Sequence, residues 1–273
     1  MTRSIVDPTP RTIGGRDVGP ISFGCWRFVD DDEAAADRLI ETALEVGMNL
    51  IDVADVYGFD WGGAGLGHAE ELLGGVLARH PDWRDRMVLA TKGGIVPGVP
   101  YDSSPEHLRS ACEASLDRLG VDRVDLYLVH RPDLLAHPAG VAETLLALRE
   151  EGKIGAIGVS NHTVSQTMAL ESHLGEPVVA VQPEFSALHL DPMRDGTFDH
   201  AMATGAVPMA WSPLSGGQLA TGEGVSAELL AVLDELAQAR DVGRSTIALA
   251  FVLAHPSRPI AIVGTQNPER IRW

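Results

Sequence analysis

Four side chains that could transfer or stabilise a proton lie at or just after the ends of apolar runs. Asp52 and Tyr57 belong to the stretch IDVADVYG, Lys92 to MVLATKGG and His130 to VDLYLVH. A phenol is a poor acid at neutral pH because its unperturbed pKa is about 10, but a neighbouring ammonium favours its ionised form. A carboxylate in turn keeps that ammonium charged. If the four groups meet, they predict an acid–base site in which Tyr57 donates a proton.

Each of these residues also has an ordinary structural interpretation. His130 could be a buried structural histidine, Asp52 a loop cap, Lys92 a chain that reaches solvent and Tyr57 a loop anchor. Their joint occurrence favours a site, because stability alone does not require ionisable groups next to apolar strands. Asp55, which lies between Asp52 and Tyr57, is interpreted as a turn acceptor without a role in the chemistry.

The elements that must position these groups are short β-rich runs separated by segments with helical periodicity. Eight such runs occur, at residues 20–26, 48–55, 87–94, 124–130, 154–161, 178–185, 206–213 and 260–265. The segments between them carry helix signals, such as the acids that open 30–47 and the Ser cap, Pro105 and Gly120 of the next long connector. Strands that alternate with crossover helices pair in parallel. Eight βα units predict an α/β protein with a closed (β/α)8 TIM barrel, whereas a doubly wound sheet usually has fewer strands.

The two ends of the chain add smaller elements to this barrel. The stretch RTIGGRDVGP predicts a short N-terminal hairpin with a Gly-Gly turn. The closing NPERIRW begins like an eighth helix and stops after about two turns, which indicates either a truncated C-terminal helix or a tail missing after Trp273. No linker or repeat interrupts the sequence, so residues 1–273 are expected to form a single domain.

Composition excludes several classes of function. The formal charge is −17, from 21 Lys plus Arg and 38 Asp plus Glu, which is the wrong sign for binding nucleic acid. No window approaches a membrane span, and the N-terminus has no apolar signal core. The two cysteines, Cys25 and Cys112, have neither metal-ligand nor disulfide spacing. We therefore expect a cytoplasmic protein that binds neither nucleic acid nor membrane.

A barrel of this kind carries its active site at the carboxyl ends of its strands. The side chains at those ends are unusually polar, and they are Asp52, Lys92, His130, Ser160, Asn161, Gln182, Trp211, Ser212 and Thr265. Together with their flanking residues they resemble the aldo-keto reductase superfamily, most of all its bacterial oxidoreductase branch. The resemblance rests on IDVADVYG, ATKGG, LYLVHRPD, GVSN, VQPEFS, WSPL and IVGTQNPER, which occur in that family's order and spacing from about residue 10 onward.

The resemblance implies a nicotinamide-dependent reductase that converts a small-molecule aldehyde or ketone into an alcohol. The family's catalytic tetrad falls on Asp52, Tyr57, Lys92 and His130. Tyr57 would deliver the proton, Lys92 would stabilise the phenolate and Asp52 would hold the lysine. His130 would orient the carbonyl oxygen by a hydrogen bond.

The family's cofactor positions are implied for Ser160, Asn161, Gln182, Trp211, Ser212, Leu214, Gly264, Thr265, Gln266 and Arg270. The first three would bind the carboxamide, and Trp211 would stack on the nicotinamide in place of the common tyrosine. Ser212 and Leu214 match the loop that crosses the pyrophosphate. Arg270 matches the arginine for the 2′-phosphate, although Gly264 stands where many relatives have lysine. NADPH is therefore favoured and NADH is possible. Neither G-x-G-x-x-G nor a P-loop is present.

Other chemistries stay open as alternatives. Lys92 could form a Schiff base as in barrel aldolases, but this leaves GVSN, Trp211 and Arg270 without a role. Ser160 lacks the second glycine of a nucleophile elbow, and no H-E-x-x-H motif supports metal hydrolysis. Some relatives of the family are cofactor-bound regulatory subunits of channels, which an intact tetrad does not exclude.

The substrate and the oligomeric state are not readable from the sequence. Substrate choice depends on loops 58–67, 93–103 and 131–137, which differ in composition but do not identify a ligand. The short loops predict an open, permissive cleft for aldehydes or ketones. Heptads and an evident adhesive patch are both lacking, so nothing argues for one assembly state over another.

Overall fold

Eight strands of the chain close into a barrel, in the order β10-β3-β4-β5-β6-β7-β8-β9. The computed structural model describes residues 6–30, 32–59, 62–99 and 101–272. The barrel strands are β3 (Ile21–Gly24), β4 (Leu50–Asp52), β5 (Val88–Gly93), β6 (Val124–Val129), β7 (Ile154–Ser160), β8 (Ala180–Gln182), β9 (Val207–Ala210) and β10 (Ile260–Val263). Every neighbouring pair is parallel. The predicted (β/α)8 TIM barrel is therefore confirmed.

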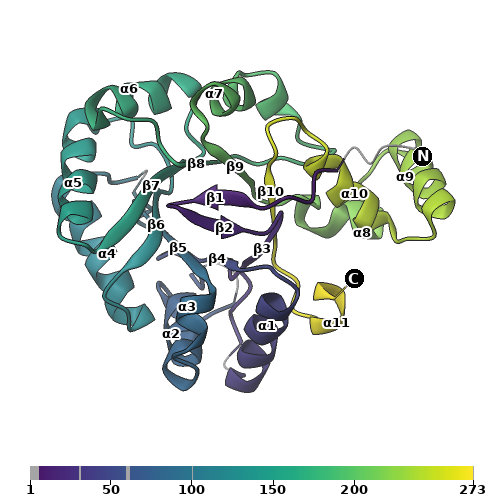
Figure 1. Cartoon of the computed structure of the whole chain (residues 1–273), viewed down its shortest axis with the longest axis horizontal. Coiled ribbons are helices and arrows are strands. Elements are labelled where there is room, and N and C mark those ends of the chain that lie inside the picture. Colours follow the sequence, from purple (N-terminus) through teal and green to yellow (C-terminus); the bar gives the residue numbers. More distant parts are fainter. Residues whose placement is uncertain (1–5, 31, 60–61, 100, 273) are drawn as a thin grey trace.

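Helices surround this barrel on its outside (Figure 1). They are α1 (Glu33–Glu45), α2 (His68–Arg79), α3 (Trp83–Arg86), α4 (Pro105–Leu119), α5 (Pro138–Glu150), α6 (Val164–Leu174), α7 (Thr197–Thr204), α8 (Gln218–Thr221), α9 (Ala227–Arg240), α10 (Arg244–Leu253) and α11 (Pro268–Ile271). Two 3-10 turns, η1 (Asp191–Met193) and η2 (Ser215–Gly217), complete the elements. Helix α11 has four residues, fewer than the two turns expected from the sequence, and Asn267 caps it by accepting from the backbone N–H of Glu269.

Alternation along the strands explains why the ionisable groups face the barrel interior. Asp52, Lys92 and His130 each lie two residues after an apolar member of the interior cluster. Side chains two residues apart point to the same face, so each polar group continues the inward column of its own strand. The apolar layer beneath them includes Leu50, Val88, Ala90, Leu126, Leu128, Ala156, Ala180, Met209 and Ile260. The sequence thus places three polar groups on top of an apolar plug.

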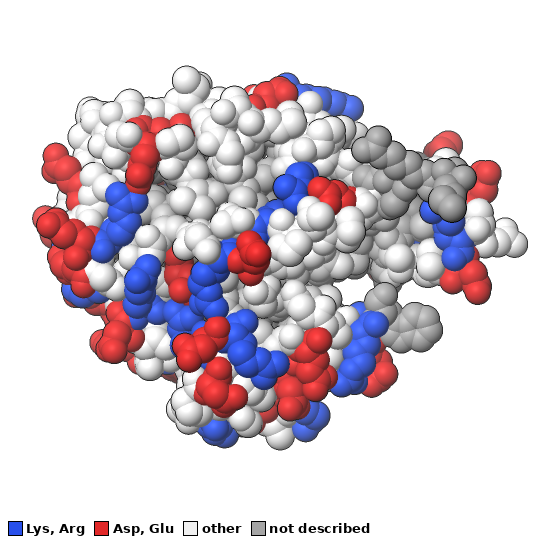
Figure 2. Space-filling view, viewed as in Figure 1, with Lys and Arg blue, Asp and Glu red and all other residues white. Residues whose placement is uncertain are grey.

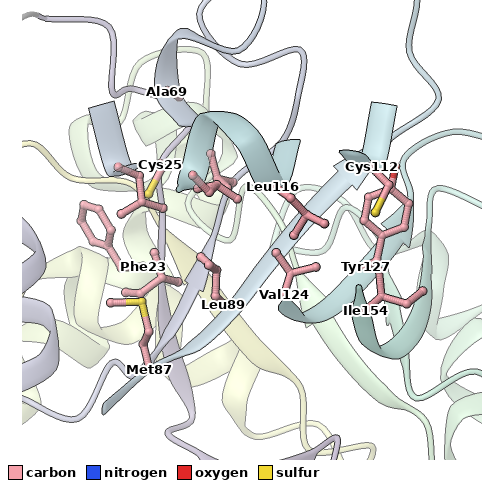
Figure 3. Close-up of a cluster of buried hydrophobic side chains, with 14 of the residues drawn as sticks. Phe23, Cys25, Ala69, Met87, Leu89, Cys112, Leu116, Val124, Tyr127 and Ile154 are labelled. Carbon is pink, nitrogen blue, oxygen red and sulfur yellow. The ribbon is translucent and has the colours of Figure 1, made fainter. Parts of the chain in front are cut away.

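A second apolar layer lies between the strands and the surrounding helices. Figure 3 shows part of it, with side chains such as Leu89, Leu116 and Tyr127 packed between strand and helix. Both cysteines are free and buried in this layer. Burial of a large apolar side chain contributes about 1.5–3 kcal/mol, so this layer holds the helices on the barrel and fixes the strand ends.

The N-terminal hairpin covers the end at which the strands begin. Strands β1 (Arg11–Ile13) and β2 (Arg16–Val18) are antiparallel and lie across the barrel in Figure 1. Their turn uses Gly14 and Gly15 with φ of 56° and 81°, the left-handed conformation that a two-residue hairpin requires. Ile13 and Val18 belong to the interior cluster. The hairpin closes this end and leaves the carboxyl ends of the strands as the open mouth.

The surface carries both signs of charge despite the net charge of −17. On the face shown in Figure 2, acidic and basic side chains are interspersed. In the part of the chain that the structure describes, no helix has the length and apolar character needed to span a bilayer. The described residues likewise form no group of three or more potential metal ligands.

Candidate active site

The ammonium of Lys92 is the centre of the polar group at the barrel mouth. Its Nζ lies 2.8 Å from Asp52 Oδ2, 2.9 Å from the Val53 carbonyl oxygen and 3.0 Å from the hydroxyl of Tyr57. The lysine side chain is fully buried and that of Asp52 nearly so. All three ammonium protons therefore have acceptors, and the predicted contact of acid, amine and phenol is present.

Tyr57 reaches this position because its loop folds back over the strand ends. The backbone N–H of Asp55 donates to the Lys92 carbonyl at 3.1 Å, and that of Tyr57 donates to Ala54 at 3.1 Å. The Tyr57 carbonyl accepts from Ala69 at the start of α2, at 3.2 Å. The loop is thus bonded to β5 on one side and to α2 on the other, which directs the phenol onto Lys92.

The charges of this group shift the pKa values of its members. Burial disfavours the ammonium of Lys92, but Asp52 and Tyr57 more than offset that penalty, so its pKa lies above the usual value. Burial also raises the pKa of Tyr57, and the charge of Lys92 opposes this rise. At neutral pH the lysine is therefore charged and the phenol carries its proton.

His130 stands beside the phenol as a neutral ring. Its imidazole meets the Tyr57 ring edge to face, with centroids 5.9 Å apart. Burial, together with the charge of Lys92, holds the pKa of His130 well below its ordinary value. The ring atom Nδ1 is buried and has no hydrogen-bond partner among the described residues. A neutral imidazole with an uncommitted nitrogen suits a hydrogen bond to a ligand.

Side-chain amides link the tetrad to the neighbouring strands. Gln182 donates to Asp52 Oδ1 at 3.0 Å, so the acid is held from β8 as well as by the lysine. Ser160 Oγ donates to the Gln182 carbonyl at 3.0 Å. The sequence assigned Gln182 to the cofactor alone, and its bond to Asp52 was missed. The alternation of side chains along β8 predicts that Gln182 points into the barrel. Its bond to Asp52 could not be predicted, because only closure of the barrel brings β8 opposite β4.

Asn161 and Trp211 form a second pair at the mouth. The side-chain N–H2 of Asn161 donates to the His130 carbonyl at 3.2 Å and to Ser160 Oγ at 2.8 Å. The indole N–H of Trp211 donates to Asn161 Oδ1 at 2.9 Å. Asn161 has a φ of 59°, a left-handed conformation that asparagine tolerates better than most residues. The bonds fix the plane of the indole, which is partly exposed.

The residues matched to the phosphates lie on two loops after β9 and β10. Ser212 has a φ of 52°, and its Oγ accepts from Gly216 at 2.9 Å, while Leu214 packs on the small cluster around Leu219. Thr265 Oγ1 accepts from Asn267 at 3.3 Å and Gln266 Nε2 donates to the Gly264 carbonyl at 3.4 Å. These hydrogen bonds lie within the two loops and stabilise their conformations.

Two further features of the β10 loop affect its charge. Arg270 is exposed and forms no ion pair with any described residue, whereas Arg272 contacts both Glu45 and Glu269. At Gly264, a Cβ atom would lie 2.9 Å from the indole of Trp26. A lysine at position 264 would therefore force Trp26 to move. Close packing against Trp26 explains why glycine occupies this position.

The loops predicted to line a substrate cleft surround this mouth. Phe59 and Tyr101 are exposed, at 46% and 37%. Residues 60, 61 and 100 of the predicted cleft loops lie outside the described residues. A separate cavity of about 200 Å³ lies under residues 132–138 and against α6, and no tetrad residue lines it. The tetrad is thus not part of that cavity.

Comparison with known proteins shows the family of the chain. The Aldo/keto reductase family matches residues 20–272. The chain belongs to the aldo/keto reductase family. This aldo/keto reductase is 47% identical over 269 residues to the 6-dehydroglucose reductase of Novosphingobium aromaticivorans, covering 97% of the chain and 88% of the relative. It is 35% identical over 265 residues to the 6-dehydroglucose reductase of Agrobacterium fabrum, covering 92% and 86%.

A solved structure agrees with the sequence relatives. The glycerol dehydrogenase of Gluconobacter oxydans superposes with a TM-score of 0.84 at 26% identity, covering 97% of this chain and 88% of that one. The family resemblance and the fold predicted from the sequence are thereby confirmed. The protein is an oxidoreductase, and its relatives support reduction of a carbonyl compound.

Proposed function

We propose that this aldo/keto reductase reduces an aldehyde or ketone to an alcohol with NADPH, and that Tyr57 is the proton donor. The observation that carries the proposal is the 3.0 Å contact between the Tyr57 hydroxyl and the Lys92 ammonium. A bound nicotinamide would supply the hydride that the substrate carbon receives. The protein's own residues then have to bind the carbonyl oxygen and give it a proton.

The proton step follows from the charges around Tyr57. As the carbonyl oxygen gains negative charge, the phenol O–H transfers its proton to it, and the O–H bond of the new alcohol forms as that of Tyr57 breaks. The phenolate left behind faces the Lys92 ammonium, which Asp52 keeps in place. His130 donates its ring N–H to the same oxygen and fixes the angle of approach.

The same geometry argues against a Schiff base on Lys92. A nucleophilic lysine needs a free lone pair, which a depressed pKa provides. Here the pKa of Lys92 is raised and its three protons are donated to Asp52, Val53 and Tyr57. Borohydride in the presence of a carbonyl substrate should therefore leave the lysine unmodified.

Several residues suit a bound nicotinamide nucleotide. Trp211 offers a flat face whose plane is fixed by Asn161. Asn161 gives both amide protons and Ser160 its hydroxyl proton to other protein groups, so Ser160, Asn161 and Gln182 would bind the carboxamide as acceptors, through their side-chain oxygens. Arg270, which is exposed and has no ion pair with a described residue, favours a 2′-phosphate and hence NADPH over NADH.

We further propose a sugar carbonyl as a substrate class. Two relatives are named for reduction of 6-dehydroglucose. Exposed aromatic rings after β4 and β5, Phe59 and Tyr101, offer flat apolar surfaces against which a sugar ring could pack. Simple aldehydes should also be reduced, more slowly than 6-dehydroglucose.

The test is NADPH consumption with a panel of carbonyl compounds, with the alcohol products identified by NMR. We expect turnover of 6-dehydroglucose and of small aldehydes, with a clear preference for NADPH over NADH. Tight cofactor binding without turnover of any carbonyl would contradict the proposal and favour a regulatory subunit. Strong preference for one compound, with all others poor, would contradict the permissive mouth.

A further inference from the structure

Behind the tetrad lies a buried acid that the mechanism does not use. Asp55 is only 8% exposed, and its Oδ1 has no hydrogen-bond partner among the described residues. Its carboxyl accepts from the backbone of Val56, in keeping with a turn acceptor. A turn acceptor is ordinarily solvated, however, and a buried carboxylate oxygen without a donor is costly. Asp55 therefore needs an explanation beyond the turn.

The cations near Asp55 are already committed to other acids. Glu70 of α2 is fully buried and accepts from Thr91 Oγ1 at 2.5 Å and from Arg118 Nε at 2.8 Å. Lys92 donates its protons to Asp52, Val53 and Tyr57. The charged groups that act on Asp55 are thus Glu70 from α2, Arg118 from α4 and Lys92 from β5, and neither cation has a hydrogen bond to it.

Two further titratable groups lie near Asp55: His68, which begins α2 directly after Gly67, and Tyr127 of β6. Asp55 and Glu70 add to the burial that raises the pKa of Tyr127, whose hydroxyl is buried without a partner among the described residues. Figure 3 shows Tyr127 and Cys112 within the strand–helix core. Two carboxylates in such surroundings do not both ionise readily. Burial and the Glu70 carboxylate raise the pKa of Asp55 to about 7.

The backbone of Asp55 connects this acid to the reacting groups. Its N–H donates to the Lys92 carbonyl at 3.1 Å, and its carbonyl accepts from Gly67, just before α2, at 2.7 Å. Tyr57 lies two residues further along the same loop. Any shift of Asp55 away from Glu70 therefore moves the loop that carries the phenol.

We propose that Asp55 is a positioning residue: its neutral carboxyl can stay buried while the backbone bonds to Gly67 and Ala69 hold the Tyr57 loop on α2, and its ionisation loosens that loop. This inference rests on the proposed carbonyl reduction. Repulsion between Asp55 and Glu70 then displaces Tyr57 from Lys92, which slows proton transfer. Asn at position 55 imitates the neutral carboxyl, whereas Ala removes it.

The first test compares single-turnover reduction by wild type, Asp55→Asn, Asp55→Ala and Asp17→Asn between about pH 5.5 and 8.5. Asp17 is an exposed acid on the hairpin, at the opposite end of the barrel. Wild type and Asp17→Asn should lose about tenfold in rate with a midpoint near pH 7, while Asp55→Asn stays fast and flat and Asp55→Ala is slow throughout. A pH profile of Asp55→Asn that matches wild type would overturn the proposal.

The second test does not depend on turnover. Infrared difference spectra of wild type and Asp55→Asn, without cofactor, should show a protonated-carboxyl band at about pH 6 that disappears by about pH 8.5. Absence of this band at the lower pH refutes the assignment even if carbonyl reduction is intact. A band in a protein that reduces no carbonyl refutes the proposed function instead, so the two failures can be told apart.

Discussion

The hydroxyl of Tyr57 and the ammonium of Lys92 lie 3.0 Å apart at the carboxyl ends of the barrel strands. Three further hydrogen bonds fix the two groups, from Lys92 to Asp52 and Val53 and from Gln182 to Asp52. The phenol therefore faces a cation that has no freedom to turn away. This arrangement would stabilise a phenolate, which the proposed role of Tyr57 as proton donor requires.

Replacement of Asp52 should destabilise the protein. Asp52→Asn removes the counter-charge of a fully buried ammonium, and loss of one partner of a buried pair costs about 3–5 kcal/mol. Denaturant unfolding measures this loss. Asp52→Asn/Lys92→Met, which removes both charges, should recover most of it. Equal stability of the single variant and wild type would show that the lysine is neutral in the fold.

His130 should make the protein less stable in acid. Its folded pKa lies below the unfolded value, so the unfolded state binds a proton first as pH falls through about 6.5, and stability is lost below that point. Relative to His130→Asn, wild type should lose about 1 kcal/mol between roughly pH 6.5 and 5.5. Unfolding at the two pH values measures the difference, and a difference that is constant with pH would mean that folding does not lower the pKa of His130.

Trp211 should govern cofactor binding through its flat face and its bond to Asn161. Trp211→Ala is expected to weaken NADPH binding about tenfold in calorimetry, since aromatic contacts contribute about 0.5–1.5 kcal/mol beyond the buried area. Trp211→Tyr keeps an aromatic face and should bind almost as tightly as wild type. Unchanged affinity of the alanine variant would remove Trp211 from the cofactor site.

Arg270 should distinguish NADPH from NADH. An unpaired guanidinium that contacts a phosphate contributes about 1.5–3 kcal/mol, so Arg270→Met should weaken NADPH binding by about tenfold or more and leave NADH unchanged. Arg272→Met is the matched control, because Arg272 is paired with Glu45 and Glu269. Equal losses for both nucleotides would place Arg270 away from the 2′-phosphate.

Much of this site could be predicted from strand periodicity. Alternate side chains of a strand point into the barrel, and active sites lie at the carboxyl ends of the strands, which places Asp52, Lys92 and His130 at one mouth. The hairpin and the capped helices follow from local signals. The contact that could not be predicted depends on closure of the barrel. Gln182 donates to Asp52 across the barrel, from a residue 130 positions away, and no local pattern encodes such a pair.

The burial of Asp55 and the packing of Trp26 on Gly264 were missed for the same reason. From the sequence, Asp55 is predicted to be a turn residue. It is buried because α2 packs against its loop. From the sequence, Gly264 only lacks the lysine that many relatives have at this position. In the structure it packs closely on Trp26 and so joins the loops after β3 and β10. Both depend on contacts between segments that are distant in the chain.

The most direct test of the account is the single-turnover rate of hydride transfer in Tyr57→Phe, at saturating NADPH and aldehyde. Tyr127→Phe, which also removes one phenol oxygen but within the strand–helix core, is the control. The account predicts that Tyr57→Phe binds cofactor normally and loses about 10²–10⁴-fold in rate, while the control stays within about twofold of wild type. Full reductive rate in Tyr57→Phe would contradict the assignment of Tyr57 as proton donor.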